Sequence, residues 1–309
     1  MNDQPYVSYL VAGTQRSGTT VTHHCLRGHP HVSALREELA FDPFFADGLA
    51  AFTFGRSGTT AEQKQGRRHL FDALTAPERT AETRACGVKC AFGHGKQAEH
   101  FAEVLREEFP EAKVVHVVRR DQVAQFGSFV KARSTSVFHR TGDADGNVGK
   151  GNTGTSPVLT LDPHNFARYM LDIHEANAYL RRLGETHDVF TVEYESDILQ
   201  GDLRSNDALF SFVNVEPREA VWLRHRKVSP APEMYIANYA ALSDLQAEIE
   251  SRLNAGHSTA ELREEYAPPL SKSLYQTGRH WVKHPGYAAH QIAHGLKKVF
   301  GSSQTEPSS

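Results

Sequence analysis

Short apolar runs alternate with longer amphipathic stretches along most of the chain. The runs are rich in β-branched or aromatic residues, which favours buried strands, whereas the longer stretches favour helices. The predicted strands cover residues 7–12, 87–92, 113–118 and 189–192. The predicted helices cover residues 19–27, 61–74, 98–108, 121–132, 166–183 and 240–253.

The first strand, turn and helix have the shape of a phosphate-binding loop. The stretch YLVAGTQRSGTT begins at Tyr9, and its turn runs from Gly13 to Gly18. Such a turn directs backbone N–H groups and a helix N-terminus at an anion. The glycine spacing is that of the nucleotide triphosphatase loop, but Thr19 stands where that loop has its lysine. A nucleotide with a short 5′ tail therefore fits better than a triphosphate, and Arg16 supplies a cation within the turn.

This order of elements predicts an α/β fold. We expect a single P-loop-like three-layer domain, in which helices flank a central, mostly parallel sheet and the C-terminal third is helical. The domain is expected to span residues 1–301, with a flexible loop at 141–160 and a disordered tail at 302–309. Two interpretations of residues 141–160 remain open: a flap that covers a second substrate, and a disordered segment. Ligands of such sheets bind at the carboxyl ends of the strands.

Two segments resemble sulfotransferases that use 3′-phosphoadenosine 5′-phosphosulfate (PAPS). GTQRSGTT, from Gly13, resembles the family's 5′-phosphosulfate loop. VVHVVRRDQVAQFGS, from Val114, resembles its 3′-phosphate element, in which an arginine at a strand end is followed eight residues later by a serine. Arg120 and Ser128 keep that spacing.

Two further segments extend the likeness to about residues 6–245. VEYE, from Val192, resembles a strand ending in Tyr-Glu near the adenine. RKVSPAPE, from Arg226, followed by IANY, from Ile236, resembles the closing segment of bacterial carbohydrate-type and trehalose-type members. The resemblance implies a transferase that takes PAPS as donor and releases 3′-phosphoadenosine 5′-phosphate, with no metal.

The resemblance also implies roles for individual residues. Arg16 would stabilise the bridging oxygen as the bond to sulfur breaks, and Lys89 would contact the sulfuryl group. The implied nucleotide-binding residues are Gln15, Arg16, Ser17, Gly18, Thr19, Thr20, Arg120, Ser128 and Tyr194. The alternatives are an ordinary surface arginine at 16 and a solvated strand end at 119–121.

The base that accepts the acceptor's proton is less defined. Carbohydrate sulfotransferases place a glutamate in a His-Pro-x-Val…Glu…Phe stretch, and HPHVSALREELAF, from His29, fits. Glu38 is the closest match, Glu37 is next, and both could instead simply begin a solvated helix. Phenol and steroid sulfotransferases use a histidine after Lys-Thr, a pattern that KCAFGH lacks, so His94 is the alternative base.

The composition of the chain limits the classes of binding partner and the cellular location that we expect. A net charge of −3 gives no general case for nucleic acid, and no apolar run is long enough to span a membrane. Three cysteines without a C-x-x-C pair and an N-terminus without signal-peptide features favour the cytoplasm. Residues 281–300 form a basic amphipathic stretch that could dock on the domain, join a homodimer or touch a membrane. The histidines around Cys25 are better explained by helix packing than by metal binding.

The expected acceptor is a hydroxyl group of a sugar, a glycolipid or a small natural product. Two other functions remain open: a P-loop kinase of small molecules and a non-catalytic nucleotide-binding protein. The missing loop lysine opposes the kinase.

Overall fold

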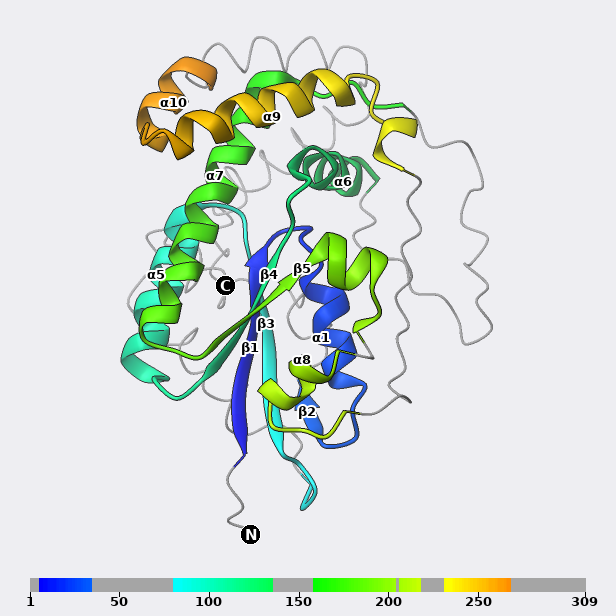
Figure 1. The fold of residues 1–309 in the computed structure, drawn as a ribbon, viewed down its shortest axis with the longest axis vertical. Coiled ribbons are helices and arrows are strands. Elements are labelled where there is room, and N and C mark those ends of the chain that lie inside the picture. Colours follow the sequence, from blue (N-terminus) through cyan, green and yellow to red (C-terminus); the bar gives the residue numbers. More distant parts are fainter. Residues whose placement is uncertain (1–5, 35–79, 136–157, 204–205, 218–230, 268–309) are drawn as a thin grey trace, which may run out of the picture.

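The computed structural model describes residues 6–34, 80–135, 158–203, 206–217 and 231–267 (Figure 1). The strands are β1 (Val7–Thr14), β2 (Val32–Ala34), β3 (Ala85–Phe92), β4 (Lys113–Val118) and β5 (Val189–Glu193). The α-helices are α1 (Thr19–Arg27), α5 (Gly95–Glu108), α6 (Gln122–Thr135), α7 (Pro163–Arg182), α8 (Asp207–Phe212), α9 (Tyr239–Asn254) and α10 (Thr259–Tyr266). Short helical turns are η1 (Leu183–Glu185), the π-helical η2 (Tyr194–Gln200) and η4 (Pro232–Met234).

The described strands form one sheet in the order β2-β3-β1-β4-β5, and every neighbouring pair is parallel. The predicted α/β fold with a mostly parallel sheet is confirmed. Because all these strands run the same way, their carboxyl ends share one edge, with β1 in the middle. In Figure 1 this edge faces upward, toward α6 and α9.

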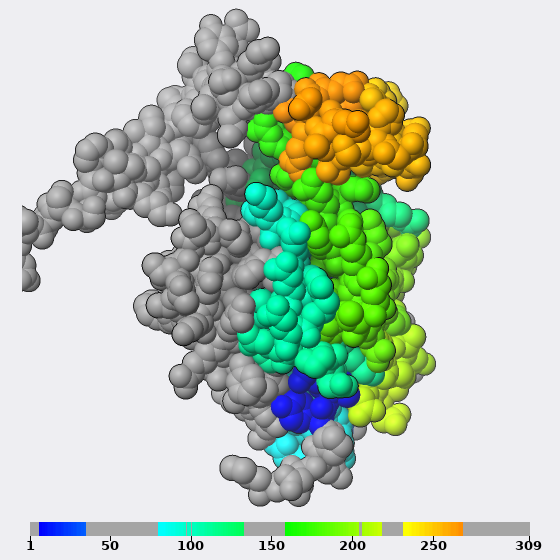
Figure 2. Space-filling view, turned by 90° about the vertical axis from the view of Figure 1, so that its left-hand side faces the viewer, coloured from blue at the N-terminus to red at the C-terminus, as the bar shows by residue number. Residues whose placement is uncertain are grey.

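Side chains alternate along the strands and so divide the core in two. On one face, Leu10 and Ala12 pack with α5 and α7. On the other, Tyr9 and Val11 pack with α1 and α8. Figure 2 shows α5 and α7 side by side over the first face. The sheet therefore lies between two helical layers, as expected for a three-layer domain.

A third cluster of buried side chains lies beyond the carboxyl edge. It joins α6 and the N-terminal half of α7 to α9 and α10 through residues such as Phe126, Phe166, Ile249 and Leu262. Leu159 and Ile236 form a parallel bridge beside it. These helices cover the edge at which a ligand of a parallel sheet is expected.

Some elements depart from the prediction. The three-residue strand β2 was not predicted, because it is too short to show alternation. The strand β5 ends at Glu193, and Tyr194 opens the π-helical turn η2 instead of closing the strand. The helix predicted at 61–74, most of the loop at 141–160 and the stretch at 281–300 lie outside the described residues. Within the described ranges, no helix is both long and apolar enough to cross a bilayer.

Candidate active site

The β1–α1 loop (residues 15–18) contains two left-handed backbone conformations. Arg16 has a φ of 64° and Gly18 a φ of 108°. A Cβ at position 18 would lie 2.7 Å from Ile198 Cδ1 and 2.9 Å from Tyr194 Cδ2, so only glycine fits there without displacement. Left-handed residues interspersed in a turn make concave groups of N–H donors, which bind anions.

The helix α1 begins at this loop without a side-chain cap. Its first backbone hydrogen bond runs from the Thr22 N–H to the Gly18 carbonyl, at 3.1 Å. The N–H groups of the first turn have no carbonyl within the helix to bond. The Ser17 hydroxyl is fully buried and has no hydrogen-bond partner in the described structure. The loop and the helix N-terminus together have the donors that an anion requires.

Lys89 reaches this helix from the neighbouring strand β3. Its ammonium donates a hydrogen bond of 2.8 Å to Thr20 Oγ1, and its side chain is buried. The Gln15 N–H donates to the Phe92 carbonyl at the end of the same strand, at 2.9 Å. The structure therefore brings Lys89 to the predicted phosphate loop.

The helix α6 contacts the loop from the opposite side. Arg16 Nε donates to Ser128 Oγ at 3.1 Å. Gln125 Nε2 donates to Thr14 Oγ1 at 2.9 Å and to the Gln15 carbonyl at 2.6 Å. Burial lowers the pKa of Arg16, and the nearby Arg119 guanidinium lowers it further. Arg16 and Ser128, which are 112 residues apart in the chain, thus meet at the site.

Arg119 is a site residue that the sequence analysis missed. It follows β4 and is 8% exposed. Its Nη1 donates to the Arg16 carbonyl at 3.2 Å, and its guanidinium carbon lies 4.3 Å from the centroid of the Tyr194 ring. Its Nε is buried and has no hydrogen-bond partner within the described ranges. Strand alternation was the available signal, because Arg119 continues the buried series of Val115 and Val117.

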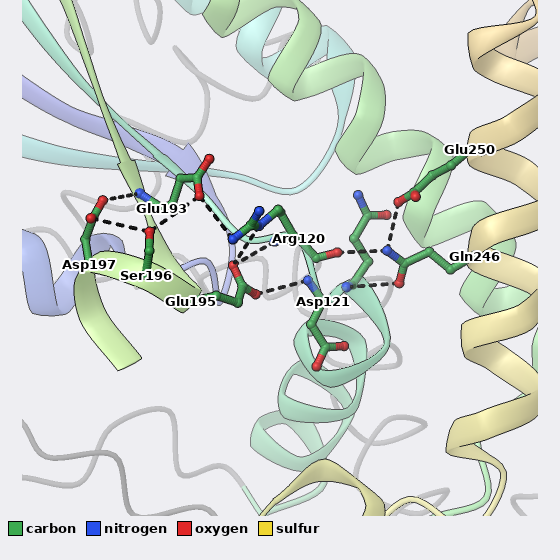
Figure 3. A network of polar contacts seen from close by, with 9 residues as sticks. Arg120, Asp121, Glu193, Glu195, Ser196, Asp197, Gln246 and Glu250 are labelled. Atoms are coloured by element: carbon green, nitrogen blue, oxygen red, sulfur yellow. Dashed lines mark hydrogen bonds and ion pairs between the residues drawn. The ribbon is translucent and has the colours of Figure 1, made fainter. Parts of the chain in front are cut away.

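Arg120, the predicted reader of the 3′-phosphate, reaches toward Glu193 and Glu195 in this structure (Figure 3). Its side chain is 64% exposed, and its Nη2 lies 3.2 Å from Glu193 Oε2. Its Nε lies 4.0 Å from Glu195 Oε2, and the same carboxylate accepts the backbone N–H of Arg120 and of Asp121. Gln246 of α9 donates to the Arg120 carbonyl at 2.8 Å. Arg120 is thus paired with two carboxylates.

The remaining predicted residues divide into two groups. Tyr194 lies between Gly18 and Arg119, beside the loop. His94 precedes α5 and follows the end of β3 by two residues, so it lies at the carboxyl edge. Glu37 and Glu38 lie outside the described residues. Within the described part of the chain, no three His, Cys, Asp or Glu side chains gather closely enough to hold a metal ion.

The comparisons with known proteins agree on one family. The model described as "Sulfotransferase family" matches residues 9–216, which include most of β1, the loop, β4 and β5. No curated protein matches the chain.

Similar solved structures are sulfotransferases. A sulfotransferase from Alicyclobacillus acidocaldarius is 13% identical, with a TM-score of 0.47, and the alignment covers 84% of this chain and 100% of that one. A sulfotransferase domain from the Synechococcus PCC 7002 olefin synthase is 17% identical, with a TM-score of 0.43 and coverage of 80% and 90%. One from the curacin biosynthetic pathway is 12% identical, with a TM-score of 0.43 and coverage of 86% and 100%.

Proposed function

The chain belongs to the sulfotransferase family, and on this premise we propose that it transfers the sulfuryl group of PAPS to a hydroxyl group. The acceptor we propose is a sugar, a glycolipid or a small natural product. The observation that carries the proposal is the β1–α1 loop, with two left-handed residues, an uncapped helix behind it, the cation Arg16 within it and the cation Lys89 beside it.

The residues present fit a nucleotide that bears a single 5′-phosphate group and a sulfuryl group. The buried Ser17 hydroxyl and the first turn of α1 offer unused hydrogen-bonding capacity. Thr19 replaces the lysine that a triphosphate loop uses for its outer phosphates. The implied product, 3′-phosphoadenosine 5′-phosphate, carries a single phosphate at its 5′ position, and this is the group that such a loop holds.

The chemistry is in-line transfer, in which an oxygen–sulfur bond forms to the acceptor while the sulfur–oxygen bond to the 5′-phosphate breaks. Positioning and electrostatic stabilisation dominate such reactions. Arg16 and Lys89 would stabilise the negative charge that develops on the leaving phosphate and the sulfuryl oxygens. Because an arginine keeps its proton, Arg16 acts as a fixed cation and not as an acid.

The acceptor hydroxyl needs a base, and we propose Glu38 for that role, with Glu37 and His94 as alternatives. The support for Glu38 is its place in the family-like stretch from His29, and the support for His94 is its position at the carboxyl edge. The acceptor's proton passes to this base as the new bond to sulfur forms. A well-placed base contributes about 10²–10⁴-fold in rate.

For the 3′-phosphate we propose Ser128 and Arg120. Ser128 is supported by its hydrogen bond with Arg16, which places it beside the loop. Arg120 is supported by the family spacing, and it would have to leave Glu193 and Glu195 to face the phosphate. We also propose a cytoplasmic location, which the three buried cysteines without a disulfide support.

Calorimetric titration tests the nucleotide assignment. We expect 3′-phosphoadenosine 5′-phosphate to bind at least about tenfold more tightly than AMP, because hydrogen bonds to a charged group contribute about 1.5–3 kcal/mol. We also expect ATP to bind more weakly than the bisphosphate. Tighter binding of ATP would favour a kinase.

Turnover tests the reaction. A panel of hydroxyl compounds is incubated with PAPS that carries labelled sulfate, and transfer of the label to at least one acceptor is expected. Nucleotide binding without transfer to any acceptor class would favour a non-catalytic nucleotide-binding protein.

A further inference from the structure

The two left-handed residues of the β1–α1 loop each contact one member of a single side-chain pair. Arg119 donates from Nη1 to the carbonyl of Arg16, at 3.2 Å. The Tyr194 ring lies beside Gly18, where it occupies the space that a Cβ would need. Arg119 and Tyr194 are stacked on each other, with 4.3 Å between the guanidinium carbon and the ring centroid.

The loop needs such support because its backbone is strained. A residue with a Cβ adopts positive φ only where its surroundings impose it, and Arg16 has a φ of 64°. The carbonyl that Arg119 holds belongs to this same residue. Gln125 and Tyr169 donate to the preceding carbonyl, that of Gln15.

The support comes from two different strand ends. Arg119 follows β4 and Tyr194 follows β5, and these strands are neighbours in the sheet. The stacked pair therefore ties the loop after β1 to the two strands on one side of it. Arg119 is buried at this position, whereas Arg120 is 64% exposed and paired with glutamates.

Burying Arg119 near Arg16 also has an electrostatic cost. Two guanidinium groups lie close enough for Arg119 to lower the pKa of Arg16. A residue that only filled space at the end of β4 would not need a second positive charge beside the first. A hydrogen-bond donor aimed at the Arg16 carbonyl accounts for the choice of arginine.

We propose that Arg119 and Tyr194 are a positioning pair that holds the β1–α1 loop in its anion-binding conformation. In this role Arg119 acts through the backbone of Arg16 and not on the 3′-phosphate. The identity of the anion rests on the function proposed above, whereas the effect on the loop does not.

Hydrogen exchange of the ligand-free protein tests the pair without any nucleotide. In Arg119→Met, the hydrogen-bonded backbone amides of Gln15, Ser17 and Thr22 should exchange at least about tenfold faster than in the wild type, because local opening becomes easier. Tyr194→Leu should behave similarly, whereas Tyr194→Phe should resemble the wild type because the stacking uses only the ring. Unchanged exchange of these amides in Arg119→Met would overturn the proposal.

The chain offers a matched control for the loss of a stacked arginine. Arg182 lies over the Tyr179 ring, 5.1 Å from its centroid, at the end of α7. Arg182→Met removes the same kind of contact away from the loop, so exchange of the Gln15, Ser17 and Thr22 amides should stay at the wild-type rate. If Arg119→Met fails to fold, the comparison of Tyr194→Leu with Tyr194→Phe decides the question, and equal exchange in those two variants would refute the pair.

Nucleotide affinity separates a positioning role from direct contact. In Arg119→Met, affinity for 3′-phosphoadenosine 5′-phosphate and for AMP should fall by the same factor, because both need the loop. A fall confined to the bisphosphate would place Arg119 on the 3′-phosphate and overturn the proposal. If the wild type binds neither nucleotide, the proposed function fails while the exchange measurements still decide whether the pair holds the loop.

Discussion

The helices α7, α9 and α10 form a helical cap over the carboxyl edge of the sheet. The two regions differ in how many of their polar groups have hydrogen-bond partners. Within the helical cap, the Asp162 carboxylate at the N-terminus of α7 accepts the Asn165 N–H at 2.8 Å. At the N-terminus of α10, the side chains of Ser258 and Glu261 each accept the other residue's backbone N–H. Arg263 joins the two helices through ion pairs. The starts of α7 and α10 and the charges between these two helices are therefore paired, whereas α9 begins at Asn238 without a side-chain cap.

At the carboxyl edge the same rules are broken within a few residues. The helix α1 begins without a side-chain cap, Arg16 is left-handed, and the Ser17 hydroxyl is buried without a described partner. Departures of this kind persist where function requires them. On the function proposed above, the helical cap stabilises the fold, whereas the carboxyl edge keeps its hydrogen-bond donors for a ligand.

The largest expected effect follows from removing the cation of the loop. Arg16→Gly should lower kcat by about 10²–10³-fold, because a fixed charge at the leaving phosphate is lost. The midpoint temperature of unfolding should not fall substantially, since glycine adopts a φ of 64° without strain. Transfer of labelled sulfate and differential scanning calorimetry measure the two quantities.

The exposed Arg182 provides the control for this change. Arg182→Ala removes an arginine from the end of α7 and should leave sulfate transfer unchanged. Normal transfer by Arg16→Gly would contradict the leaving-group role of Arg16. A large fall in the midpoint temperature of unfolding of Arg16→Gly would instead mean that the carboxyl edge supports the fold.

The second effect concerns the base. Glu38→Gln should lower kcat by about 10²-fold or more while nucleotide affinity stays nearly constant, because the base acts on the acceptor's proton. The parallel variants are Glu37→Gln and His94→Ala. A loss confined to His94→Ala would transfer the role to the residue beyond β3, and a loss confined to Glu37→Gln would shift the assignment by one position.

The third effect belongs to the interior of the sheet and depends on pH. His116 of β4 is fully buried, and its Nε2 lies 3.2 Å from Asn177 Oδ1. Burial lowers its pKa from 6.5 to about 4. Between these values the unfolded chain binds the proton and the folded protein does not, so stability is present above pH 6.5 and is lost as the pH falls toward 4.

The cost for this single histidine reaches about 2 kcal/mol at pH 5, since each pKa unit corresponds to about 1.4 kcal/mol. Urea unfolding at pH 7, 6 and 5 measures the change in the free energy of unfolding. Proton NMR of the His116 ring isolates this residue from the other histidines. A resonance that titrates near 6.5 would contradict the burial argument.

The two regions also differ in how much of their structure could be predicted from the sequence. The hydrophobic pattern predicted β1, β3, β4 and β5 and their parallel arrangement, because the first three are buried apolar runs and β5 is a short run rich in β-branched and aromatic residues. The loop was predicted because its glycine spacing and helix start are local features. Arg16, Lys89 and Ser128 were selected from motifs, and the structure places them around that loop.

What the sequence analysis missed depends on contacts between distant segments. A motif of fixed spacing selected Arg120, whereas alternation along β4 buries Arg119 instead, and only the fold brings Tyr194 against it. The strand β2 has three residues and shows no period of its own. By contrast, α10 could have been predicted, because Ser258 and Glu261 form the Ser-x-x-Glu pattern of a helix start.

The smallest expected effect completes the comparison from the side of the cap. Ser258→Ala removes the hydroxyl that accepts the Glu261 N–H at 3.2 Å, and the free energy of unfolding should fall by about 1 kcal/mol. Ser251→Ala, at an exposed position inside α9, is the matched control and should be neutral or slightly stabilising, because alanine favours helix interiors. Affinity for 3′-phosphoadenosine 5′-phosphate should be unchanged in both variants, as measured by calorimetry. A weaker affinity in Ser258→Ala alone would show that the cap also shapes the carboxyl edge, and the division between the two regions would then be wrong.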